Sequence, residues 1–239
     1  MGFVQVLRLT AACGVMLILP AAQAAANLVV NGSFESPAAP AGGYLNYAGG
    51  STAIPGWTVV GVDSAVVNKT FTQNGIVFES EDGNQWLDLS GVTSNSRSSG
   101  VTQDVPTTTG MAYRLSFYVG SATDNTLFFP ATVDLSIDGG ARVSYTNPTA
   151  PATRLDWELF TVEFTATKSS TNLTFFNGGA SKNYLAALDN VSLDPAPPPV
   201  PMLGLVPHIA LAGALLLLAL ATVRSKGRRR VSEVRDGGS

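Results

Sequence analysis

Between residues 27 and 193 hydrophobic side chains recur at every second position, and this period constrains the fold more than any other feature. In residues 111–120, Leu115 and Phe117 alternate with Arg114 and Ser116. Residues 131–138 and 157–167 show the same alternation. A period of two is typical of a β-strand with one buried face, and no ten-residue helical pattern competes with it. The pattern therefore predicts antiparallel strands.

Shorter segments with strand character fill the rest of this region, separated by turns rich in Gly, Ser, Asn, Thr or Pro. The further expected strands are residues 27–33, 56–60, 65–67, 75–79, 85–90, 100–105, 142–145, 171–177 and 187–193. About ten strands without crossover helices predict an all-β fold of two packed antiparallel sheets, a jelly roll or a related β-sandwich. The 167 residues suffice for one domain with its own core.

The first 26 residues have the layout of a secretory signal peptide. One positive charge, at Arg8, precedes an apolar stretch over residues 9–19, and small residues offer a cleavage site at 22–26. This order of charge, apolar run and small residues is what export signals share. We therefore expect residues 1–26 to be a signal peptide and the domain to be exported.

The C-terminal 46 residues predict a membrane anchor. Residues 194–204 form a proline-rich linker, and residues 205–223 form an apolar run just long enough to cross a bilayer as a helix. Residues 224–239 carry six basic and two acidic residues, whereas residues 27–204 carry seven basic and fifteen acidic ones. By the positive-inside rule the tail is cytoplasmic and the domain lies outside.

Composition excludes several function classes. The only cysteine and the only histidine, Cys13 and His208, fall in the predicted signal peptide and the predicted membrane helix. The domain therefore has no disulfide, thiol nucleophile or histidine base, and most hydrolase and zinc chemistry is excluded. A formal net charge of −3 argues against nucleic acid as a partner.

Several segments together resemble a known class of β-sandwich. They are residues 27–37 (NLVVNGSFESP), 54–61 (IPGWTVVG), 86–91 (WLDLSG), 100–106 (GVTQDVP), 110–117 and 187–193 (ALDNVSL). In this order they resemble the bacterial choice-of-anchor C family, a galactose-binding-like sandwich related to a plant cell-wall family of domains of unknown function. The resemblance implies a constant exported domain joined to a variable anchor.

The tail also resembles the PEP-CTERM type sorting signals of Gram-negative exopolysaccharide producers, in which a proline motif, an apolar helix and arginines follow one another. It departs from them because residues 200–203 read VPML and nine residues follow Arg230. Two interpretations stay open: a sorting protease trims the chain, or the helix is a plain membrane anchor.

Asp189 is the most conspicuous single residue. It shares the parity of Leu185, Ala187, Val191 and Leu193, so its carboxylate is expected on a buried face, where it needs compensation. By the resemblance, Asp189 and Glu35 would hold a structural calcium, helped by neighbouring oxygens. The alternative is that Asp189 accepts backbone N–H groups at a strand end.

Aromatic residues offer platforms for sugar rings, and planar polar side chains offer partners for hydroxyls. Trp57 is expected in the core, whereas Trp86 is the better binding candidate because Leu87 and Leu89 have the opposite parity. The predicted ligand-binding residues are Trp86, Asn84, Gln85, Asp88, Tyr44 and Tyr47. The two tyrosines are expected in an exposed glycine-rich loop.

Glu79, Glu81, Asp82 and Asp88 form the main cluster of acidic residues, and their ordinary interpretation is a solvated loop. We therefore predict no catalytic residues. The leading hypothesis is a non-catalytic, surface-anchored protein that binds extracellular polysaccharide. The alternatives are an adhesive matrix protein without a defined ligand and a glycan-acting enzyme that uses residues 79–88.

Overall fold

The computed structural model describes residues 27–92, 97–124, 130–149, 151–179 and 184–197. The predicted signal peptide, the membrane helix and the basic tail lie outside these residues, as does the linker beyond residue 197. No helix in the described part of the chain is long and apolar enough to span a bilayer.

The described residues form thirteen strands and no α-helix. They are β1 (Tyr44–Ala48), β2 (Thr58–Val60), β3 (Asp63–Asn68), β4 (Thr72–Gln73), β5 (Ile76–Val77), β6 (Gln85–Asp88), β7 (Gly100–Pro106), β8 (Ala112–Ser121), β9 (Ala131–Ile137), β10 (Val143–Asn147), β11 (Asp156–Thr165), β12 (Ser170–Asn177) and β13 (Ala187–Pro195). The alternating segments at 111–120, 131–138 and 157–167 became β8, β9 and β11, which confirms the strands predicted there.

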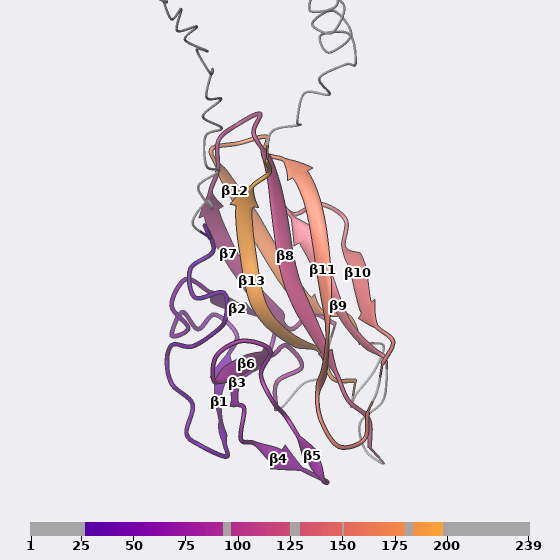
Figure 1. The fold of residues 1–239 in the computed structure, drawn as a ribbon. Helices are drawn as coiled ribbons and strands as arrows, with labels where there is room; N and C mark the ends of the chain where they lie inside the picture. The colour runs from indigo at the N-terminus through magenta and orange to yellow at the C-terminus, as the bar shows by residue number, and fades with distance from the viewer. Residues whose placement is uncertain (1–26, 93–96, 125–129, 150, 180–183, 198–239) are drawn as a thin grey trace, which may run out of the picture. The chain divides into compact units, whose positions relative to one another are not determined.

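Two antiparallel sheets face one another (Figure 1). The six-stranded sheet has the order β1-β3-β6-β13-β8-β11, and the five-stranded sheet has the order β10-β9-β12-β7-β2. From β7 onward the chain passes repeatedly from one sheet to the other, as in jelly rolls. The predicted all-β antiparallel sandwich is confirmed.

The main core lies between the sheets, where both present their alternating apolar residues. Phe117 on β8 packs edge-on against Phe175 on β12, with ring centroids 5.1 Å apart. Trp57 is 1% exposed and packs against Phe34 and Phe175, so its expected core position is confirmed. Burial of these rings, together with the aliphatic side chains around them, holds the two sheets together.

A second apolar cluster covers part of the outer face of the six-stranded sheet. The short hairpin of β4 and β5 and its flanking loops lie beyond β3 and β6, at the lower end of Figure 1. Ile76 and Phe78 are buried there together with Trp86 and Leu155. This sheet therefore buries apolar side chains on both faces near β3 and β6, which simple alternation does not predict.

The segment expected as a strand at residues 27–33 is instead an irregular wrap, so that prediction is wrong. Asn31 and Phe34 both have positive φ values, 54° and 53°, which a strand does not allow. Gly32 passes so close to β13 that a Cβ atom there would lie 2.0 Å from the Val191 carbonyl oxygen. The backbone N–H of Val191 donates to the Gly32 carbonyl at 2.9 Å. Close tertiary contact with β13 decides this conformation.

A β-bulge in β13 changes the expected parity of its residues. Asp189 pairs with Tyr118 and Ser192 with Ser116, so β13 has one extra residue there, and Asn190 has a φ of 47°. Leu188, Val191 and Leu193 consequently face the core. Asp189 lies on the opposite, outer face with Ala187, which corrects the single buried face expected from the sequence.

Candidate functional site

A pocket of about 300 Å³ opens on the outer face of the six-stranded sheet, between that face and the β4–β5 hairpin. Its polar side chains are Gln73, Asp88 and Ser90. Its aromatic side chains are Tyr44, Phe71, Phe78, Trp86 and Tyr184. Three of the predicted binding residues therefore meet in one pocket, Tyr44 from β1 and both Trp86 and Asp88 from β6.

Trp86 forms part of the pocket wall but is largely enclosed. The Leu87 and Leu89 side chains face the main core as expected, and Trp86 points to the other side of the sheet. There it is only 2% exposed, because it stacks on Phe78 and packs edge-on against Trp157. Its indole N–H donates to the Phe78 carbonyl at 3.0 Å. Trp86 thus supports the pocket rather than offering an open sugar platform.

Tyr44 supplies the exposed aromatic surface. It lies on the edge strand β1, not in the loop expected from the sequence, and is 44% exposed. Its ring packs edge-on against Phe71, with centroids 5.8 Å apart. Tyr47, three residues later on the same strand, instead packs against the main core. Tyr47 therefore does not belong to the pocket.

Asp88, half-buried at the end of β6, is the one carboxylate among the described residues that line the pocket. Its Oδ1 accepts the backbone N–H of Ser90 at 2.8 Å and the Ser90 hydroxyl at 2.5 Å. Burial raises the pKa of Asp88 to about 6 against these hydrogen bonds, and the nearby charge of Asp63 adds to the rise. The pocket therefore holds a carboxylate that is ionised at neutral pH and loses its charge in mild acid.

Asn84 and Gln85 do not line the pocket. The Gln85 side chain is buried, accepts the Ala39 N–H at 2.8 Å and donates to the Phe34 and Pro37 carbonyls. The backbone N–H and side-chain amide of Asn84 both donate to Glu35. These two residues secure the irregular wrap of the N-terminal segment, which is a structural role.

Glu35 and Asp189, the predicted calcium ligands, both accept hydrogen bonds from the loop between β5 and β6. Asp189 is fully buried, and its carboxylate accepts the backbone N–H groups of Glu81 at 2.9 Å, Asp82 at 3.0 Å and Asn190 at 2.7 Å. This is the alternative considered for Asp189. Burial raises the pKa of Asp189 to about 8, while the three donors lower it.

Glu35 is engaged in the same way. Its Oε1 accepts the backbone N–H groups of Asn84 at 2.7 Å and Gln85 at 3.0 Å. Among the described residues, no group of three or more acidic, histidine or cysteine side chains could hold a metal ion. In the structure the carboxylates of Glu35 and Asp189 both accept hydrogen bonds from N–H donors. Calcium binding by these two residues therefore stays a prediction, and it needs its own test.

The acidic cluster is divided by the fold. Asp82 accepts the Ser33 hydroxyl at 2.7 Å, and Glu81 accepts the Asn190 side-chain amide at 2.7 Å. Neither lines the pocket with Asp88, so the structure does not place a pair of carboxylates in that pocket as a glycosidase requires.

Sequence reasoning missed the hairpin side of the pocket. Phe71, Gln73 and Phe78 come from a segment in which only a strand at residues 75–79 was expected, and Tyr184 precedes β13. The spacing of Phe71, Ile76 and Phe78 fits neither a clean strand nor a helix. Their aromatic and apolar character in a turn-rich segment was the available signal that this loop folds back onto the sheet.

One comparison with known proteins decides the family. Residues 27–194 match the model of a family described as "Protein of unknown function (DUF642)". The chain belongs to this family. The match covers β1 to β12 and all of β13 but its last residue, so the sandwich and its pocket are both parts of the DUF642 domain.

Solved structures similar to the DUF642 domain include carbohydrate-binding modules. The CBM22-1 xylan-binding domain from Paenibacillus barcinonensis is 17% identical, with 66% of this chain and 97% of that chain covered and a TM-score of 0.39. The family 35 carbohydrate binding module from Clostridium thermocellum is 15% identical, with 63% and 98% covered and a TM-score of 0.38.

An exo-beta-1,3-galactanase from Phanerochaete chrysosporium, in complex with galactose, is 19% identical with a TM-score of 0.39. The match covers 63% of this chain and only 29% of the galactanase chain, so this chain spans less than a third of the galactanase. No curated protein matches the sequence. At TM-scores below 0.5 these likenesses carry no functional conclusion.

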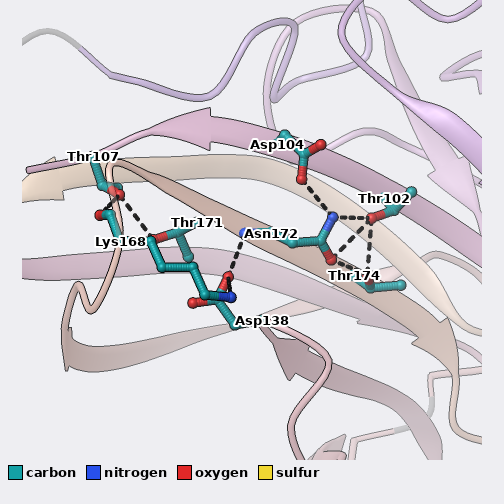
Figure 2. A network of polar contacts seen from close by, with 8 residues as sticks. All are labelled: Thr102, Asp104, Thr107, Asp138, Lys168, Thr171, Asn172 and Thr174. Atoms are coloured by element: carbon teal, nitrogen blue, oxygen red, sulfur yellow. Dashed lines mark hydrogen bonds and ion pairs between the residues drawn. The ribbon is translucent and has the colours of Figure 1, made fainter. Parts of the chain in front are cut away.

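The outer face of the five-stranded sheet in the DUF642 domain carries a network of polar side chains that hydrogen-bond to one another (Figure 2). The Asn172 side chain on β12 donates to the Thr102 hydroxyl at 3.0 Å and to the Asp104 carboxylate at 2.8 Å. It accepts the Thr174 hydroxyl at 2.8 Å, and its backbone N–H donates to Asp138. Because these groups bond to one another across strands, the face stabilises strand pairing.

Proposed function

We propose that the DUF642 domain binds extracellular polysaccharide through the pocket beside β1 and β6, without catalysis. The observation that carries this proposal is the meeting of an exposed ring, Tyr44, with a carboxylate, Asp88, over a wall formed by Trp86. Sugars present flat C–H faces that stack on aromatic rings and hydroxyls that need carboxylate or amide acceptors.

The volume of the pocket limits the size of the sugar ligand that it can bind. Its volume of about 300 Å³ is at the small end of ligand sites, which span about 300–1,000 Å³. It therefore suits one sugar unit, such as a chain end or a branch, rather than a long internal stretch of polysaccharide.

A polysaccharide binding panel with a Tyr44→Ala variant tests the proposal. Tyr44 is substantially exposed, so its truncation removes a stacking surface without opening the core, whereas Trp86→Ala would damage the buried cluster. We expect Tyr44→Ala to lower affinity at least tenfold. Leu159→Ala, at an exposed residue on β11 that does not line the pocket, is the matched control. The absence of binding to any polysaccharide by the wild-type chain would refute the proposal and favour an adhesive matrix protein.

The cellular setting belongs to the same proposal. A galactose-binding-like domain that is exported by residues 1–26, carried on the proline-rich linker and anchored by residues 205–223 would present the pocket outside the cell. Protease treatment of intact cells should then degrade the domain. The mass of the mature chain distinguishes a sorting protease, which removes the basic tail, from a plain membrane anchor, which keeps it. Recovery of the uncleaved chain from the cytosol contradicts this part of the proposal.

A further inference from the structure

A second acidic residue, Asp63, interacts with Asp88 from outside the pocket lining, and this bears on which sugars the pocket accepts. Asp63 on β3 is 2% exposed, and its Oδ2 accepts the Val92 backbone N–H at 3.0 Å. Its charge acts on Asp88, so the two carboxylates lie close enough to interact. No ion pair among the described residues involves Asp88; those present join Arg97 to Asp134, Arg114 to Glu163, Arg154 to Asp156 and Lys168 to Asp138.

The rest of the pocket wall also favours positive charge. Tyr44, Phe71, Phe78, Trp86 and Tyr184 present aromatic surfaces, whose faces carry partial negative charge. No lysine or arginine is among the described residues that line the pocket. A half-buried carboxylate beside aromatic rings is the arrangement that proteins use to hold ammonium groups.

We propose that the pocket selects a sugar unit with a free amino group, such as glucosamine, with its ammonium against the Asp88 carboxylate and its ring against Tyr44. This deepens the proposed function and rests on it. A charge-assisted hydrogen bond to Asp88 is stronger than one from a neutral hydroxyl. A uronate would place a third carboxylate beside Asp88 and Asp63, which like-charge repulsion disfavours.

The test compares oligosaccharides that differ only in charge, using the full-length chain in mild detergent at pH 7. The probes are the glucosamine trimer, its fully N-acetylated form, cellotriose and the galacturonate trimer, with binding followed by tryptophan fluorescence and calorimetry. We expect the glucosamine trimer to bind at least tenfold tighter than the other three. Equal or tighter binding of the acetylated or galacturonate trimer overturns the inference.

Asp88→Asn removes the charge at nearly constant shape. We expect the preference of this variant for the free amine over the acetylated form to fall below threefold. Asp104→Asn, at an exposed carboxylate on β7 of the other sheet, should keep the full preference. If Asp88→Asn keeps the preference, the carboxylate does not select the amine and the inference fails.

A pH series on the wild-type chain gives an answer that does not depend on the folding of a variant. The ionisable groups around Asp88 are Asp63 on β3, Tyr44 on β1 and Tyr184 before β13. The preference for the amine should therefore decline between pH 7 and pH 5 as Asp88 takes up a proton. A preference that grows or stays constant over this range contradicts the inference. Weak binding of every sugar, unaffected by Tyr44→Ala, would instead refute the proposed function itself.

Discussion

The carboxylate of Asp189 accepts the backbone N–H of Glu81 at 2.9 Å, although the two residues are 108 positions apart in the chain. The same oxygen accepts the N–H of Asp82, so one buried side chain fixes the loop between β5 and β6. This loop leads directly into β6, which carries Trp86 and Asp88 to the pocket. Asp189 is therefore a positioning residue for the candidate site.

Replacing Asp189 by alanine should destabilise the domain. The N–H groups of Glu81 and Asp82 would lose their buried acceptor, which costs about 1–3 kcal/mol of unfolding free energy. Urea denaturation at pH 5 measures this. Asp189→Asn, which keeps one carbonyl oxygen, should lose less. Asp194→Ala, at a less buried acid on the same strand, is the control. Equal effects of Asp189→Ala and Asp194→Ala would show that the loop does not depend on this acceptor.

Stability should fall as the pH rises from about 4 to about 8. Burial raises the pKa of Asp88 to about 6 and that of Asp189 to about 8, from an ordinary value of 3.8, so the folded chain keeps protons that the unfolded chain releases. The contribution is complete below pH 3.8 and is lost as the pH passes these raised values. Each group contributes a slope of at most about 1.4 kcal/mol per pH unit.

Denaturation curves at several pH values separate the two carboxyl groups. Asp88→Asn should flatten the dependence between about pH 4 and pH 6, whereas Asp189→Asn should flatten it up to about pH 8. A wild-type stability that increases over this interval would contradict the raised pKa values.

Calcium should not change the melting temperature if Glu35 and Asp189 keep their N–H partners. A ligand that binds only the folded state raises the melting temperature by mass action, so melting curves with calcium and with a chelator answer the question. A calcium-dependent increase that Asp189→Ala abolishes would establish the predicted metal site. It would also mean that calcium displaces or shares the hydrogen bonds seen here.

Asn172→Ala should weaken the five-stranded sheet without affecting sugar binding. The substitution removes the bonds to Thr102, Asp104 and Thr174 shown in Figure 2. We expect a loss of about 1–2 kcal/mol of unfolding free energy, because the network is partly exposed and water replaces some of these bonds. Thermal denaturation and the polysaccharide panel together check this. A loss of polysaccharide binding at a temperature where the variant is folded would show that this face, too, takes part in recognition.

The tertiary contacts around β13 show where reasoning from local pattern stops. Alternation identified the long strands, including β8 with Leu115 and Phe117, because a half-buried strand needs an apolar residue at every second position. It correctly expected Asp189 to be buried, but it placed Val191 and Leu193 on the same face as Asp189, because one extra residue in β13 after Asp189 reverses the parity. Local sequence does not reveal such a bulge. The bulged segment is in close contact with Gly32 at Val191, and these two residues are far apart in the chain.

For the candidate site, too, some features could be predicted from the sequence and others depended on tertiary contacts. Its residues Tyr44, Trp86 and Asp88 were recognisable from the sequence by residue type, because sugars need flat rings and charged or amide acceptors. That Trp86 is enclosed, that Tyr47 faces the core and that Gln85 is a buried structural residue depended on the hairpin and the N-terminal wrap. The sequence by itself determined the class of fold, which depends on periodic burial along each strand. The tertiary structure decided which polar and aromatic groups share one pocket, because that depends on contacts between segments far apart in the chain.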